Sequence, residues 1–295
     1  MGVSTDKLQR AWEPFMDVCR TDILYKSRIH PLPSFGGNTQ NVLLKREDES
    51  GFGTSGAKKR KLASLLPYLK EQQIKHIGII GGPRSNHVVS LLQWVREEGL
   101  MPHLFLKTAH SPAKGGNALL LDLLAEEREI QWLTNDEWPN AEKIAHRHLA
   151  NLGDKGFVVP EGGFCAPAVA GLASLLIDIE RNELALGERM NHICIDAGTG
   201  LTAAVLIWLN TWRQRHTNIE VVLTAGTQSS FTDALVQVRE WLKVYIPSGL
   251  PQEAQNYRLH RSATAAAYGS VNASIRNAVK RYARTEGVLS DPIYT

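Results

Sequence analysis

The sequence lacks the features that mark secreted, membrane-spanning and metal-binding proteins. Its only cysteines in 295 residues are Cys19, Cys165 and Cys194, and none has C-x-x-C spacing. We therefore expect reduced thiols, no metal site and a cytoplasmic location. No apolar run approaches the roughly 20 residues of a membrane helix, and residues 1–20 mix charged and apolar side chains, unlike a secretory signal. The net charge of +3 is too small to indicate a nucleic-acid partner and suits a small anionic ligand equally well.

What the chain has instead is a regular alternation of short apolar runs and amphipathic stretches. Strands are predicted over residues 42–45, 76–80, 103–107, 130–133, 156–159, 192–195 and 220–224. Helices are predicted over residues 58–70, 86–97, 118–127, 137–151, 168–181, 202–213, 232–242 and 271–284. Pro67 is expected to kink the first helix or to end it early. The alternation predicts an α/β fold, with parallel strands joined by helices that cover both sheet faces.

A glycine-rich turn precedes four consecutive cations, Lys58, Lys59, Arg60 and Lys61, at a predicted helix start. Cations there oppose the helix macrodipole, and a bound anion would compensate for them. A solvated basic face or a nuclear-localisation-like tract is the alternative interpretation. A phosphate-binding P-loop is discounted, because Ala57 occupies the position of its lysine and no Ser or Thr follows Lys58.

A second glycine-rich turn, residues 81–87, directly follows an apolar strand and opens a helix. Open α/β sheets bind ligands at such strand ends, so backbone N–H groups here could hold a carboxylate, with Asn86 and His87 facing the ligand. The alternative is purely structural, with Ser85 acting as the N-cap of the helix.

A third glycine-rich segment, residues 196–203, lies between a predicted strand and a long helix. It satisfies the dinucleotide fingerprint G-x-G-x-x-A at Gly198, Gly200 and Ala203. That fingerprint needs an acidic residue at the end of the next strand, whereas Glu220 lies at its beginning. The segment is therefore interpreted as a cradle for a single phosphate monoester rather than for a nucleotide.

Together these segments resemble the family of 1-aminocyclopropane-1-carboxylate deaminases and D-cysteine desulfhydrases. These are pyridoxal-phosphate enzymes of the tryptophan-synthase-β fold type. The resemblance runs from residues 46–48 to residues 291–295, with the motifs in the family order. It implies two open twisted α/β domains with pyridoxal 5′-phosphate in the cleft between them. Residues 1–46 and 164–295 would form the large cofactor-binding domain, and residues 47–163 a smaller α/β domain.

The resemblance also assigns roles to residues of the three motifs. Residues 56–62 match the family pattern Gly-Asn-Lys-x-Arg-Lys-Leu, which makes Lys58 the Schiff-base lysine and Lys61 a phosphate contact. Cationic neighbours agree with this role, because they favour the neutral amine that must attack an aldehyde. The family's Ser-Asn-His turn falls on Ser85, Asn86 and His87. It implies that Asn86 bonds the ring hydroxyl, that Ser85 binds the substrate carboxylate or moves a proton, and that all three residues contact substrate. The phosphate loop falls on Gly198, Thr199, Gly200, Leu201 and Thr202.

The end of the chain carries the last part of the resemblance. Tyr294 and Thr295 match a catalytic tyrosine and the residue that contacts the pyridine nitrogen, and Tyr268 matches a second tyrosine near the substrate. A buried structural role for Tyr268 is the alternative. Cyclopropane-opening deaminases place a glutamate at the position of Thr295, where its charge keeps the ring protonated. The neutral Thr295 favours the milder chemistry of β-elimination.

The sequence therefore predicts a D-cysteine desulfhydrase-like lyase that acts on a small amino acid and releases pyruvate, ammonia and sulfide. We expect a homodimer that binds neither nucleic acid nor membrane. One alternative is the cyclopropane-opening deaminase. Another is a catalytically degenerate cofactor-binding paralogue, because Ala57 replaces the family's Asn and family members continue some tens of residues beyond Thr295. The G-x-G-x-x-A match leaves a nicotinamide-dependent dehydrogenase as a third.

Overall fold

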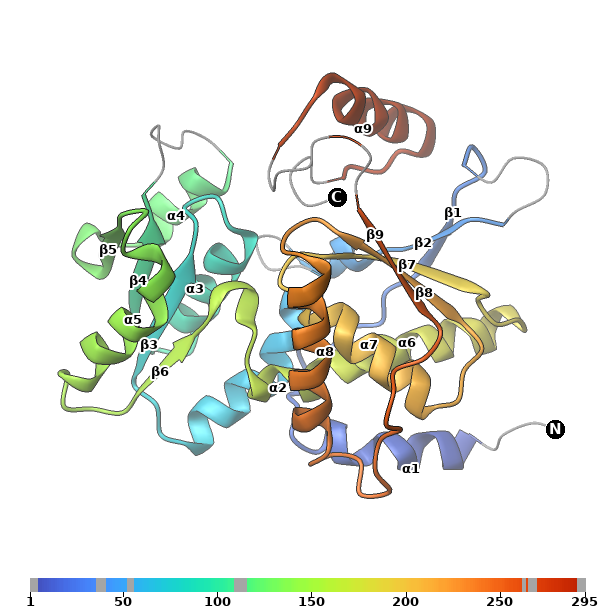
Figure 1. The fold of residues 1–295 in the computed structure, drawn as a ribbon, viewed down its shortest axis with the longest axis horizontal. Coiled ribbons are helices and arrows are strands. Elements are labelled where there is room, and N and C mark those ends of the chain that lie inside the picture. The colour runs from blue at the N-terminus through green and yellow to red at the C-terminus, as the bar shows by residue number, and fades with distance from the viewer. Residues whose placement is uncertain are drawn as a thin grey trace. The chain divides into compact units, whose positions relative to one another are not determined.

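The computed structural model describes residues 5–35, 41–51, 56–108, 116–261, 264 and 270–290. The chain divides into two compact units (Figure 1). Unit 1 consists of Met1–Tyr25 and Glu47–Gly171, and unit 2 of Lys26–Arg46 and Leu172–Thr295. The division expected from the sequence differs at residues 1–25 and 164–171. Its assignment of a large cofactor-binding domain stays a prediction.

Unit 1 is built on a parallel four-stranded sheet in the order β5-β4-β3-β6. The strands are β3 (His76–Gly81), β4 (Met101–Lys107), β5 (Ile130–Leu133) and β6 (Gly156–Val159). Every residue of β3 is buried. Both faces of the sheet are therefore covered at its centre, as parallel sheets require.

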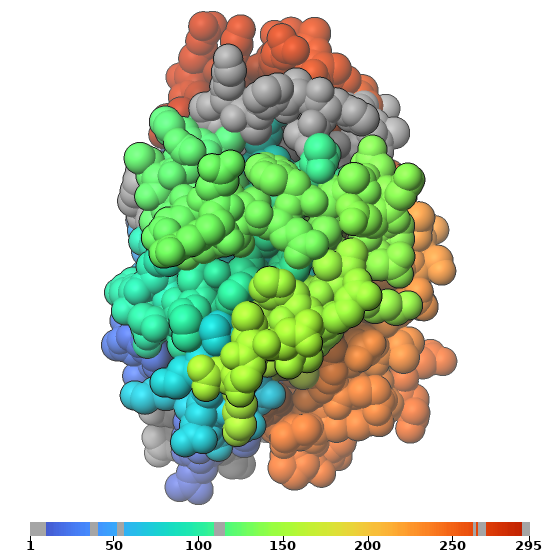
Figure 2. Space-filling model, turned by 90° about the vertical axis from the view of Figure 1, so that its left-hand side faces the viewer, coloured from blue at the N-terminus to red at the C-terminus, as the bar shows by residue number. Residues whose placement is uncertain are grey.

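The helices of unit 1 are α1 (Thr5–Met16), α2 (Ala57–Glu71), α3 (Asn86–Glu97), α4 (Asn117–Leu124) and α5 (Ala141–Ala150). Shorter 3-10 segments are η1 (Glu47–Ser50), η2 (Glu127–Glu129), η3 (Trp138–Asn140), η4 (Glu161–Gly163) and η5 (Ala166–Ala168). Figure 2 faces this unit, whose α4, β5 and α5 segments (green) form much of the visible surface.

The two faces of this sheet are packed by different helices. On one face, Ala145 and Leu149 of α5 pack with Ile80, Phe105 and Val158 of the strands in one hydrophobic cluster. On the other face, α3 approaches β3 so closely that a Cβ at Gly81 would lie 2.5 Å from Val88 Cγ2. The absence of a side chain at Gly81 therefore sets how near the start of α3 comes to the carboxyl end of β3.

Helix α2 continues through Pro67 to Glu71, so the expected early end of this helix was wrong. A proline within a helix leaves the carbonyl four residues earlier without its usual N–H donor. Here that carbonyl belongs to Ala63, and it accepts a hydrogen bond from the backbone N–H of Arg20 at 2.8 Å. The segment after α1 thus satisfies the acceptor that Pro67 leaves.

Unit 2 contains an antiparallel pair, β1 (Ile29–Pro31) and β2 (Leu43–Lys45), and a parallel sheet in the order β7-β8-β9. These strands are β7 (His192–Ala197), β8 (Asn218–Leu223) and β9 (Tyr257–Arg261). The helices are α6 (Val169–Leu186), which begins in unit 1, and α7 (Leu201–Trp212), α8 (Gln228–Leu242) and α9 (Ala273–Glu286).

The expected α/β fold with parallel strands and helical crossovers is confirmed. All seven predicted strands and all eight predicted helices have counterparts in the structure, whereas α1, β1 and β9 were not predicted. Within the described ranges, no helix combines the length and apolar character needed to span a bilayer.

Candidate active site

Lys58 lies in the first turn of α2, half-buried. The helix starts after Gly56, whose φ of +63° falls in the left-handed region that favours glycine. The N–H of Gly56 donates to Glu47 O at 2.9 Å and to Ser50 Oγ at 2.9 Å. The short segment η1 therefore fixes where α2 begins and where the lysine is placed.

Arg60 anchors the same turn through a buried ion pair. Its Nε and Nη2 donate to the two carboxylate oxygens of Glu47 at 2.8 and 2.7 Å, and its side chain is 1% exposed. The guanidinium also lies over the ring of Tyr25, 5.1 Å from its centroid, and Tyr25 donates to Glu47 O at 2.9 Å. Arg60 is therefore not part of a solvated basic face. Its charge is compensated by the Glu47 carboxylate.

Lys61 reaches the glycine turn after β6. Its Nζ donates to Gly162 O at 2.6 Å. In this turn Gly162 and Gly163 both have positive φ angles, 67° and 69°, so two consecutive glycines allow it to form. A Cβ at Gly163 would lie 3.0 Å from His87 Cε1. The turn thus packs against α3 while it binds α2.

Ser85 is the N-cap of α3, as the structural interpretation of the turn predicts. Its Oγ accepts from the backbone N–H groups of His87 at 3.2 Å and Val88 at 3.4 Å. The hydroxyl hydrogen is not used by either contact. The side chain of Asn86 accepts from Asn117 Nδ2, which also donates to Arg84 O at 3.1 Å. These bonds hold the turn at the carboxyl end of β3.

The ring of His87 is held neutral. Burial is the main cause, and the nearby cations Lys61 and Lys58 add to it, lowering the pKa of His87 to about 3. The ring hydrogen-bonds the backbone carbonyl of Pro160. At neutral pH this imidazole therefore has one N–H donor and one acceptor nitrogen.

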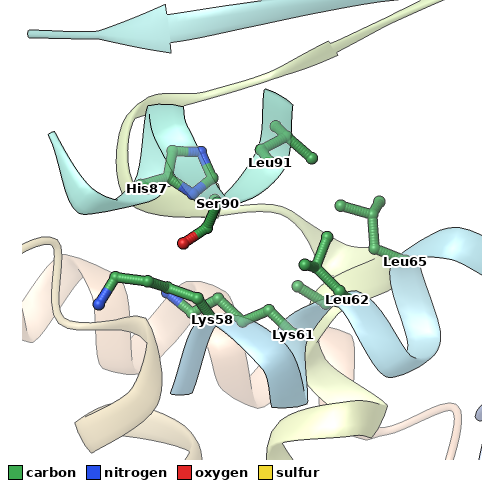
Figure 3. Close-up of a pocket in the computed structure, with 9 residues that line it drawn as sticks. Lys58, Lys61, Leu62, Leu65, His87, Ser90 and Leu91 are labelled. Atoms are coloured by element: carbon green, nitrogen blue, oxygen red, sulfur yellow. The ribbon is translucent and has the colours of Figure 1, made fainter. Parts of the chain in front are cut away.

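Lys58, Lys61 and His87 line one small cavity of unit 1 (Figure 3). Lys58 and Lys61 lie on α2, and His87 and Ser90 lie on α3 across from them. The cavity has a volume of about 10 Å³. This is room for one water molecule, so the cavity is too small for a cofactor ring.

The third glycine-rich segment forms the start of α7 in unit 2. Gly200 is the N-cap residue with φ +87°, and no side chain caps the N–H groups of the first turn. Gly198 and Thr199 are exposed, while Leu201 is buried. An uncapped helix start beside exposed backbone can accept an anion.

The structure brings together Lys58, Lys61 and His87, and it places Ser85 and Asn86 in the turn before and at the start of α3. The predicted phosphate loop, residues 198–202, belongs to unit 2. Tyr268, Tyr294 and Thr295 lie outside the described residues. Within the described part of the chain, no group of three or more His, Cys, Asp or Glu side chains is arranged to hold a metal ion.

Sequence reasoning missed the residues that support Lys58. The sequence assigned no role to Glu47, Tyr25 or Ser90. Gly162 and Gly163 were also missed, although two glycines directly after a strand are a visible turn signal.

Comparison with known proteins identifies the family and relatives of this chain. The model of the family described as pyridoxal-phosphate dependent enzyme matches residues 21–295. The chain is 25% identical over 261 residues to a D-cysteine desulfhydrase of Klebsiella pneumoniae, covering 87% of this chain and 78% of the relative. It is 23% identical over 286 residues to a 1-aminocyclopropane-1-carboxylate deaminase of Rhizobium radiobacter, covering 93% and 83%.

The fold agrees as well. The crystal structure of an ACC deaminase homologue matches with a TM-score of 0.78 at 22% identity, covering 92% of this chain and 82% of the other. Because one family model matches nearly the whole chain, this protein belongs to the pyridoxal-phosphate dependent enzymes.

Proposed function

We propose that the protein is a D-cysteine desulfhydrase-like lyase. The overall reaction converts D-cysteine and water into pyruvate, ammonia and hydrogen sulfide. Family membership supplies the general chemistry, since pyridoxal phosphate withdraws electrons from the α-carbon of a bound amino acid. The observation that carries the choice of substrate is the neutral Thr295 after Tyr294, at the position that contacts the pyridine nitrogen in the family.

Two segments suit parts of the cofactor, each within its own unit. Lys58 offers a half-buried amine in the first turn of α2, and the uncapped start of α7 suits a phosphate. Lys58 would join the cofactor covalently and Asn86 would bond its ring hydroxyl. The phosphate would be held by Lys61 and the loop of residues 198–202, and Thr295 would contact the pyridine nitrogen.

Each site residue then has a distinct task. The Lys58 amine, when not joined to the cofactor, removes the proton from the substrate α-carbon. Ser85 donates its hydroxyl hydrogen to the substrate carboxylate, because its oxygen already accepts two backbone N–H groups of α3. The positive end of the α3 dipole favours the substrate carboxylate at the same helix start. Tyr294 and Tyr268 would contact the substrate side chain and its leaving group.

The test is a comparison of substrates with matched lysine variants. Purified protein is incubated with D-cysteine, L-cysteine and 1-aminocyclopropane-1-carboxylate, and sulfide and 2-oxobutanoate are measured. We expect sulfide from D-cysteine in wild type and in Lys59→Arg, and none in Lys58→Ala. Lys59 is the matched control because it neighbours Lys58 but donates to Ser50 O at 2.9 Å.

The relative from Rhizobium radiobacter supports a second candidate, the cyclopropane-opening deaminase. Formation of 2-oxobutanoate without release of sulfide would replace our proposal with that activity. Cofactor absorbance with no turnover of any of these amino acids would favour the degenerate paralogue instead.

We also infer a cytoplasmic homodimer that acts on a small amino acid. The unpaired state of Cys19, Cys165 and Cys194 supports a reducing compartment. Size-exclusion chromatography with light scattering tests the dimer, and a monomeric mass would contradict it.

A further inference from the structure

The ring of His87 carries a buried nitrogen whose hydrogen-bonding capacity is not used. Its Nε2 is buried and has no hydrogen-bond partner among the residues that the structure describes. Buried polar atoms without partners are rare, and each one costs stability. Such an atom beside a candidate catalytic lysine points to a partner that is present only during part of the reaction cycle.

The chemical state of Nε2 follows from the other ring nitrogen. Because Nε2 has no partner, the hydrogen bond to Pro160 O comes from Nδ1, which therefore carries the ring proton. A neutral imidazole has only one N–H, so Nε2 presents a lone pair. It repels a carboxylate and can only accept from an N–H or O–H donor.

Three other polar side chains line the cavity beside this ring. The cavity around it is about 10 Å³ in volume, and its polar side chains are Lys58, Lys61, His87 and Ser90. Lys61 is directed to Gly162 O at 2.6 Å. Lys58 lies on α2 beside Lys61, on the wall of the cavity opposite His87 (Figure 3).

We propose that His87 is a positioning residue for Lys58, and that its Nε2 accepts a hydrogen bond from the Lys58 ammonium after that lysine has taken a proton from the substrate. This inference rests on the proposed function of Lys58 and deepens it. The carbon–hydrogen bond at the substrate α-carbon breaks, its proton goes to Lys58 Nζ, and the new ammonium donates to Nε2. His87 thus keeps the proton-carrying amine beside the substrate.

The proton stays on Lys58 in this step. An imidazole whose pKa is lowered to about 3 is a far weaker base than an amine. The charged and titratable groups around it are Lys58 and Lys61 on α2, and Glu161 on the turn, which faces Lys107. The Cys165 thiol lies near Lys61, and burial raises its pKa to about 11. The Cys165 thiol is therefore already protonated at neutral pH and does not take the proton from Lys58.

The test measures how readily Lys58 is protonated in the full chain without cofactor. Acetic anhydride labels neutral amines, so the extent of labelling at Lys58 is followed against pH by peptide mass spectrometry. An acceptor at Nε2 favours the ammonium form. We expect His87→Leu to lower the labelling midpoint of Lys58 by about one pH unit, the size of one charge-assisted hydrogen bond.

Matched variants separate positioning from simple loss of structure. His87→Gln retains a side-chain oxygen acceptor and should restore the midpoint, whereas His103→Gln changes an imidazole of β4 and should leave it unchanged. Lys59 in the same peptides serves as an internal reference. An unchanged midpoint in His87→Leu, an equal decrease in His87→Gln, or the same decrease in His103→Gln would overturn the inference.

A second measurement does not depend on whether His87→Leu folds. We expect the ¹⁵N resonance of His87 Nε2 to differ between wild type and Lys58→Met below the labelling midpoint, because only wild type can donate to it. Identical resonances would overturn the inference. Borohydride reduction of the cofactor-loaded enzyme separates a failure of this inference from a failure of the proposed function. If the cofactor is still trapped on Lys58, only the role of His87 has failed.

Discussion

Replacing Glu47 with alanine removes the partner of a buried guanidinium at the start of α2. Arg60 is 1% exposed and makes two bonds to the Glu47 carboxylate, at 2.8 and 2.7 Å. Removal of one partner from a fully buried pair costs about 3–5 kcal/mol. The Glu47 side chain is 23% exposed, so water can reach part of the site, and we expect a cost of about 2–3 kcal/mol.

Urea unfolding of the cofactor-free chain, followed by circular dichroism, measures this cost as a decrease in the urea concentration at the midpoint of unfolding. Glu240→Ala is the control: Glu240 also forms an ion pair, with Lys243 at 2.6 Å, but on the surface, and its loss should leave the midpoint unchanged. Arg60→Met in the Glu47→Ala background should recover part of the loss, because no charge is then left buried. A cost below about 0.5 kcal/mol for Glu47→Ala, or strictly additive effects in the double variant, would refute the reasoning.

Three further predictions concern packing, pH and thiol reactivity. A Cβ at Gly171 would lie 2.0 Å from Arg60 O, so Gly171→Ala should lower the unfolding midpoint sharply or prevent folding; a wild-type midpoint would contradict this close approach. Burial, then two neighbouring imidazoles, lower the pKa of His103 from 6.5 to about 4. The unfolded chain therefore binds the proton more tightly, and stability should fall as pH falls from 6.5 towards 4. His103→Gln should reduce that fall between pH 7.5 and 5 in urea titrations, and an equal fall in both proteins would count against it. Burial raises the pKa of the Cys165 thiol to about 11, so a maleimide at pH 7.5 should label the exposed Cys194 before it; equal labelling rates would contradict this order.

The sheet of unit 1 could be predicted because its pattern is strong and local. The strand at residues 76–80 contains the apolar run 77–80 and has glycines after it. Helix Asn86–Glu97 begins at a serine N-cap and carries an apolar face. The structure gives α3 these bounds without change. Such segments contain their own start and stop signals, so no tertiary information is needed.

The elements that were missed have weak local signals. β9 reads Tyr-Arg-Leu-His-Arg, and its two arginines and one histidine are exposed. β1 has only three residues and ends in Pro31. Each of these strands is completed by a partner strand distant in sequence, which single-sequence patterns do not reveal.

The site shows the same contrast between local and distant information. The sequence identified the cation cluster and placed Lys58 at a helix start. In the structure Lys58 also lies in the first turn of a helix, α2. It could not show that Arg60 turns inward to Glu47, thirteen residues earlier, while Lys61 reaches Gly162, 101 residues later. A run of four basic residues has no periodicity of its own, so tertiary partners decide where each side chain points.

The central claim is that the amine of Lys58 carries the cofactor. Reduction of the cofactor-loaded protein with borohydride, followed by proteolysis and mass spectrometry of the modified peptide, tests it most directly. We expect one stable adduct on Lys58, its loss in Lys58→Arg and its retention in Lys59→Arg. An adduct on a different lysine, or none in a protein that has been supplied with the aldehyde, would contradict the account.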